Sequence, residues 1–137
     1  MNKSTNEQVA DHFNQFPWKY WGMLSVRFDN GPHELERMFL KWIRRLCITS
    51  QAKIQYVYVV EQSPSNRSHI QFQLGPANVT VRQMQSLWVS CGGGVINRIE
   101  SYDRSKGSWY TVKDWLISDH KGVDTRRMNL KSKGVTA

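Results

Sequence analysis

Cysteine, proline and long apolar runs are scarce in this chain. Its 137 residues include only four prolines and two cysteines, Cys47 and Cys91. Two cysteines do not make a disulfide framework, and the lack of a Cys-x-x-Cys pair argues against a zinc finger. No apolar run is long enough to span a bilayer, and the polar start lacks the pattern of a signal peptide. We therefore expect reduced thiols, an intracellular location and no membrane partner.

Acidic residues are also few. Asp and Glu number 11 against 19 Lys and Arg, which gives a net charge of +8. Such an excess of positive charge favours a polyanionic partner, with DNA or RNA ahead of an acidic membrane surface. The length suits one domain with one core, and the hydrophobic content of 39% is typical of a folded protein.

Two runs in the middle of the chain predict a pair of strands. Residues 56–60 are rich in β-branched and aromatic side chains, and the polar residues 63–66 then interrupt the run. Residues 69–74 alternate, so that Ile70, Phe72 and Leu74 share one face. His69, Gln71 and Gln73 consequently point to the other face.

The polar face of this strand pair is a candidate metal site. His69 and Gln71 lie two residues apart, and Glu61 ends the neighbouring strand. A carboxylate, an imidazole and an amide oxygen on one face make an open site for Mg²⁺ or Mn²⁺. The alternative is that His69 and Gln71 are simply solvated polar residues.

The rest of the chain predicts an α+β fold. Residues 1–16 are polar and without sustained periodicity, which suggests a short arm or a frayed helix. The further predicted elements are a strand at 18–28, helices at 35–46 and 80–89, a strand at 95–102 and a helix from 109 to about 121 that stops at Gly122. This order suits a central antiparallel sheet with helices packed on one face. We divide the chain into an arm (1–17), one domain (18–122) and a basic tail or linker (123–137).

Tyr110 and Lys113 form a second candidate site at the start of the last predicted helix. Residues three apart project from one face of a helix. A tyrosine phenol is a weak nucleophile at neutral pH, and a nearby cation helps by stabilising the phenolate and the charge that builds on an attacked phosphate. The alternative is that Tyr110 packs in the core and that Lys113 is solvated.

Taken in order, Glu61, His69-Ile70-Gln71 and Tyr110-Thr111-Val112-Lys113 resemble the motifs of the HUH endonuclease family. The resemblance is to the replication initiators of small circular single-stranded DNA replicons, especially the circovirus and nanovirus type, whose second metal-binding His is a Gln. It covers about residues 18–120.

The resemblance implies a metal-dependent nickase that initiates rolling-circle replication at a single-stranded DNA origin. Glu61, His69 and Gln71 would bind Mn²⁺ or Mg²⁺. Tyr110 would cut one DNA strand and keep the 5′-phosphate, and Lys113 would position the phosphate. The covalent phosphotyrosine bond would also let the enzyme rejoin strands without ATP. The location would be the host nucleus for a eukaryotic virus, and otherwise the cytoplasm.

The sequence departs from the family in two respects. The first family motif matches only loosely at residues 22–28, and the helicase domain that usually follows the nuclease is not visible. Two interpretations stay open, a standalone nuclease and a piece of a longer protein with a helicase domain. A single tyrosine in the motif indicates the single-tyrosine class.

Basic and aromatic side chains supply candidate DNA contacts. The basic candidates for phosphate binding are Arg27, Arg44, Arg45, Arg98, Arg104 and Lys106. The candidates for base stacking are Trp18, Tyr20, Trp21 and above all Trp109, beside the proposed nucleophile. Two alternatives remain: an HUH transposase or relaxase with the same chemistry, and a non-catalytic RRM-like module that binds nucleic acid.

Overall fold

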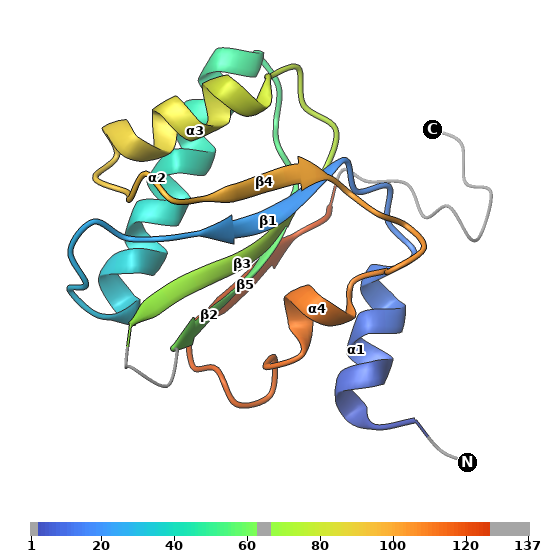
Figure 1. The fold of residues 1–137 in the computed structure, drawn as a ribbon. Helices are drawn as coiled ribbons and strands as arrows, with labels where there is room; N and C mark the ends of the chain where they lie inside the picture. The colour runs from blue at the N-terminus through green and yellow to red at the C-terminus, as the bar shows by residue number, and fades with distance from the viewer. Residues whose placement is uncertain (1–2, 63–66, 127–137) are drawn as a thin grey trace.

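A five-stranded antiparallel sheet forms the centre of the protein. The computed structural model describes residues 3–62 and 67–126. The strands lie in the order β4-β1-β3-β2-β5 (Figure 1). Their bounds are Tyr20–Leu24 for β1, Tyr56–Gln62 for β2, Ser68–Leu74 for β3, Arg98–Ser101 for β4 and Lys121–Asp124 for β5. The predicted α+β fold with a central antiparallel sheet is confirmed.

Helices cover both faces of the sheet rather than one. Helices α2 (Pro32–Ser50) and α3 (Val81–Ser90) pack on one face, and α1 (Thr5–Phe13) and α4 (Trp109–Val112) lie on the other (Figure 1). The expectation of a single covered face was therefore wrong. The reason is visible in β2, where consecutive valines are buried on alternate faces and thus require apolar cover on both sides.

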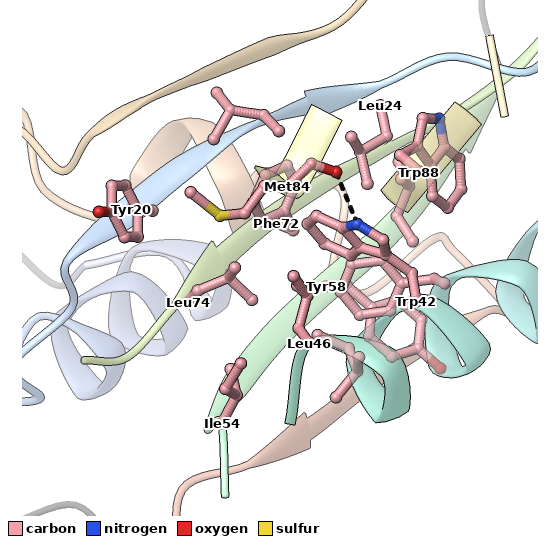
Figure 2. Packing of buried hydrophobic residues seen from close by; sticks show 14 of the residues in the cluster. Tyr20, Leu24, Trp42, Leu46, Ile54, Tyr58, Phe72, Leu74, Met84 and Trp88 are labelled. Carbon is pink, nitrogen blue, oxygen red and sulfur yellow. Dashed lines mark hydrogen bonds between the residues drawn. The ribbon is translucent and has the colours of Figure 1, made fainter. Parts of the chain in front are cut away.

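The larger core lies between the sheet and helices α2 and α3. Trp42 of α2 is fully buried beside Phe72 of β3 and Trp88 of α3 (Figure 2). Its indole N–H donates a 2.9 Å hydrogen bond to the carbonyl oxygen of Met84. Because the polar atom of this large ring has a partner, the ring can be buried completely without loss of a hydrogen bond.

The predicted helix at 109–121 is wrong in length. Helix α4 ends at Val112, and turns lead to β5, in which Gly122 pairs with Tyr58 of β2 instead of stopping a helix. The first residues of the expected tail, Val123 and Asp124, belong to this strand. The backbone N–H and C=O groups of residues 121–124 find hydrogen-bond partners on the edge of β2. Helical periodicity in the sequence cannot reveal this tertiary contact.

The N-terminal segment is a capped helix packed on the sheet. Ser4 and Glu7 form a reciprocal capping box, in which each side chain accepts a hydrogen bond from the other residue's backbone N–H. Ala10 and Phe13 are buried in a second core with Val57 and Val112. Helix α1 thus packs against the body of the fold.

Some boundaries differ from those predicted. Strand β4 begins at Arg98, and Val95 and Ile96, which were expected to start it, are exposed. The predicted turn at 63–66 and the basic residues Arg127, Lys131 and Lys133 of the expected tail lie outside the described residues. Within the described ranges, no helix combines the length and the apolar character needed to cross a membrane.

Replacing Trp42 by phenylalanine tests the core between the sheet and α2. The change removes the hydrogen bond to Met84 and part of a fully buried ring, so we expect a loss of about 1–3 kcal/mol in the free energy of unfolding. The same substitution at the exposed Trp109 is the control and should cost less than about 0.5 kcal/mol. Urea denaturation measures both values, and equal losses would contradict this packing.

Candidate functional site

Glu61 and His69 meet on the face of the sheet that carries α1 and α4. The register of β2 and β3 places the two residues directly opposite each other. His69 Nε2 lies 3.0 Å from Glu61 Oε1. Gln71 is on the same face of β3, and only 2% of its surface is exposed. The structure thus brings a carboxylate, an imidazole and an amide to one face, as the alternation of β3 indicated.

Lys113 links this pair to the region of Tyr110. Its Nζ lies 2.8 Å from Glu61 Oε2 and 5.1 Å from the centre of the Tyr110 ring. The guanidinium carbon of Arg98, on β4, is 5.6 Å from the same ring. Tyr110 is 48% exposed, so its phenol is accessible to a macromolecular substrate. Two cations therefore lie near the ring of an exposed tyrosine, and one of them, Lys113, also contacts Glu61.

The charges of Glu61 and Lys113 stabilise each other. Burial alone would raise the pKa of Glu61, but the hydrogen bonds with His69 and Lys113 outweigh it and lower that pKa. Burial likewise opposes the charge of Lys113, yet the contact with Glu61 raises the pKa of its amine overall. Burial and the neighbouring Glu61 raise the pKa of Asp114. Glu61 and Lys113 are consequently both charged at neutral pH.

A buried polar network holds the short helix α4 in place. Gln73 Nε2 donates a 3.0 Å hydrogen bond to Ser108 Oγ, and the backbone N–H of Ser108 donates to Asn14 Oδ1 at 2.7 Å. At the other end of α4, Asn6 Nδ2 donates to the carbonyl oxygen of Lys113 at 2.8 Å. Sequence analysis did not identify these positioning residues. For Gln73 the signal was present, because it follows His69 and Gln71 on the same face.

The predicted DNA contacts fall into two groups, and the first lies near the site. Arg98 contacts the Tyr110 ring, and Trp109 is exposed beside it in sequence. Arg27 lines a groove of about 830 Å³ that also borders His69. Arg98, Trp109 and Arg27 therefore each lie next to a residue of the candidate site.

The second group lies elsewhere. Arg44 and Arg45 belong to α2, on the opposite face of the sheet from α4. Arg104 stacks over the Tyr102 ring with its guanidinium near the Phe16 carbonyl oxygen, and Lys106 lines a hollow against α1. Arg44 and Arg45 thus lie on the far face of the sheet, whereas Lys106 shares its hollow with Trp109.

Two of the residues considered for base stacking are core residues. Trp18 is buried, and its indole N–H donates to the Phe13 carbonyl oxygen at 2.7 Å. Tyr20 is also buried, and its hydroxyl donates to the Val79 carbonyl oxygen at 3.1 Å. Trp21 is half-buried, whereas Trp109 is 44% exposed. Trp109 therefore keeps its place as the candidate for stacking on a base.

Glu61, His69 and Gln71 are the residues on this face that could hold a divalent cation. Glu61 Oε1 and His69 Nε2 are close enough to bind one ion together, and the Gln71 side chain adds an amide oxygen to the same face. Lys113 contacts the other carboxylate oxygen, Oε2, so that Oε1 faces His69. Such a set suits Mn²⁺, which accepts both imidazole and carboxylate ligands, or Mg²⁺.

A double-mutant cycle of Glu61→Gln and Lys113→Met tests the contact that joins α4 to the sheet. We expect a coupling of about 1 kcal/mol at neutral pH in EDTA, kept small because Lys113 is partly solvated. The folded-state pKa of Glu61 lies below its ordinary 4.5, so the coupling should be present above that pH and fade as pH falls through the folded value.

The exposed pair of Lys3 and Asp11 serves as the control for this cycle and should show a much weaker coupling. Urea unfolding over a series of pH values measures both cycles. A coupling that is absent at neutral pH, or that survives unchanged in acid, would contradict the Glu61–Lys113 contact.

Comparison with protein-family models, with curated proteins and with solved structures finds no match to this chain.

Proposed function

We propose that the protein is a single-stranded DNA nickase and strand-joining enzyme that uses Tyr110 as its nucleophile. The observation that carries this proposal is a half-exposed phenol flanked by Lys113 and Arg98, with Lys113 also bound to Glu61 of the Glu61–His69 pair. A phenol needs nearby positive charge to react at neutral pH. Lys113 and Arg98 are the two cations beside this ring, and each also contacts a carboxylate, Glu61 and Glu100 respectively.

The proposed step is an in-line displacement at phosphorus. The phenol of Tyr110 loses its proton, its oxygen forms a bond to the phosphorus, and the bond from phosphorus to the 3′-oxygen breaks. The leaving 3′-oxygen takes up a proton and becomes a free hydroxyl that can prime synthesis. Lys113 and Arg98 stabilise the negative charge on the phenolate and on the phosphate in the transition state. Reversal of the same step rejoins two strands.

A divalent cation would complete the site. Glu61, His69 and Gln71 are the residues that would hold Mn²⁺ or Mg²⁺, which polarises the scissile phosphate when bound. Lys113 then has two tasks, since it both neutralises Glu61 and stays near the Tyr110 ring.

The surface beside the site suits a single strand of DNA. The groove lined by Arg27 and His69 leads along the end of β1 and offers apolar and basic contacts. The net charge of +8 favours association with a polyanion. On this proposal the natural substrate is single-stranded DNA at a replication origin, with a helicase activity supplied by a further domain or another protein.

The RRM-like alternative receives less support. RRM modules stack bases on aromatic side chains of the central strands. In this protein the corresponding face of β3 carries Gln71 and Gln73, which are 2% and 0% exposed beneath the elements that cover them. A transposase or relaxase would use the same residues and chemistry as the nickase, so it differs in its DNA target alone.

Tyr110→Phe tests the nucleophile. The protein is incubated with a randomised single-stranded DNA library in Mn²⁺ and then run on a denaturing protein gel. DNA labelled at its 3′ end should become attached to the protein, and DNA labelled at its 5′ end should be released, because Tyr110 retains the 5′-phosphate. We expect EDTA or Tyr110→Phe to abolish the covalent band.

Tyr56→Phe is the matched control, because Tyr56 packs against Phe39 on the other face of the sheet. It should leave the covalent band unchanged. Loss of the band in the control but not in Tyr110→Phe would rule out Tyr110. A shift of DNA on a native gel with no covalent band from the unaltered protein would identify a binding module.

His69→Ala tests the metal site separately from the nucleophile. We expect cleavage to fall at least about 100-fold, since the variant loses a metal ligand, while DNA binding on a native gel changes little. Circular dichroism checks the fold of the variant. Unchanged cleavage in a folded His69→Ala protein would argue against this site.

A further inference from the structure

A second cluster of metal-binding side chains lies where helix α2 begins. His33 and Glu36 are three residues apart and share one face of the helix, and His120 comes from the connection just before β5. One ligand atom of each residue lies within 4.8 Å of those of the other two. His120 Nδ1 is 3.3 Å from Glu36 Oε1, and the two histidine rings are 6.2 Å apart between centres.

The surrounding structure holds Glu36 in a suitable orientation. Its Oε2 accepts a 2.5 Å hydrogen bond from the hydroxyl of Tyr58, which leaves Oε1 toward His120. Gly122 makes room for the Tyr58 ring, because a Cβ at that position would approach it to 2.7 Å. A partner that orients a ligating carboxylate in this way is typical of metal sites.

The backbone of His120 is also fixed. Its carbonyl oxygen accepts a 2.9 Å hydrogen bond from the backbone N–H of Val60, and its own N–H donates to Ser118 Oγ at 3.2 Å. His33 is exposed, and its ring faces that of His120. Ligand atoms in a tetrahedral zinc site lie roughly 3.3 Å apart, so a bound ion would draw the three ligand atoms, now within 4.8 Å of one another, closer together.

Two imidazoles and one carboxylate are the ligand set of zinc sites that keep a fourth position open. We propose that His33, Glu36 and His120 bind a Zn²⁺-type transition metal that joins the start of α2 to the connection between α4 and β5. Its two nitrogen donors distinguish it from the candidate Mn²⁺ or Mg²⁺ site at Glu61, His69 and Gln71. The proposal does not depend on the nickase activity.

Such a metal would hold the segment that follows Lys113 in place. That connection lies against β2, where Ser118 Oγ donates a 2.7 Å hydrogen bond to the Val60 carbonyl oxygen. Asp114, Glu61 and His120 line one hollow of about 310 Å³ between the two clusters. The metal would therefore limit the movement of the segment that carries Lys113 without contacting Tyr110.

Titration of the metal-free full chain with Zn²⁺ tests this proposal. Calorimetry should give one tight site per chain, and Co²⁺ in its place should show the visible absorption of a tetrahedral complex. His33→Ala and His120→Ala should each weaken Zn²⁺ binding by at least about 100-fold, beyond the usual cost of losing a supporting partner. Zn²⁺ should also raise the thermal unfolding midpoint of the unaltered protein but not of these variants.

Two controls separate this site from others. His12→Ala removes an exposed histidine of α1 and should bind Zn²⁺ within about twofold of the unaltered protein. His69→Ala should likewise retain the tight site, which separates failure of this proposal from failure of the nickase proposal. Absence of a tight site, normal binding by His33→Ala, or loss of the site in His69→Ala alone would each overturn the assignment.

Discussion

The arrangement of the site depends on the carboxylate of Glu61. Its side chain is 5% exposed, and its two oxygens contact His69 of β3 and Lys113 beyond α4. A buried charge needs such partners, because an unpaired one would cost several kcal/mol. This one group therefore ties two strands of the sheet to the segment that carries Tyr110.

The contact between Glu61 and Lys113 links the packing of α4 to the proposed chemistry of Tyr110. If Lys113 leaves Glu61, the carboxylate keeps only His69 of these two partners, so the contact favours the position of Lys113 near the Tyr110 ring. The hydrogen bonds of Gln73 to Ser108 and of Asn6 to Lys113 hold both ends of the short helix. A helix of four residues would not be stable alone, so these contacts position the phenol.

The sequence predicted the central strand pair well because its signals are local. Alternation in β3 identified the polar face of His69, and burial of the intervening apolar residues fixes the register that sets Glu61 opposite it. The capping box of Ser4 and Glu7 was equally local and could have revealed α1. Helix α1 covers the second face of the sheet, because Val57 is buried on that face and needs an apolar partner.

Other features depend on contacts between distant segments. The chain after Val112 has helical periodicity, but its residues 121–124 join the edge of β2, and Trp115 packs against Phe13 of α1. The approach of His33 and Glu36 to His120 has the same origin, since 84 positions separate the last two residues. No spacing within one element indicates such a cluster.

Peptide mapping by mass spectrometry can locate the covalent bond between the protein and DNA. The protein is incubated with single-stranded DNA and Mn²⁺, treated with nuclease to trim the attached DNA, and digested with trypsin. We expect a nucleotide joined through its 5′-phosphate to the peptide that contains Tyr110. A nucleotide on another tyrosine, or no adduct although the DNA is cut, would contradict this expectation.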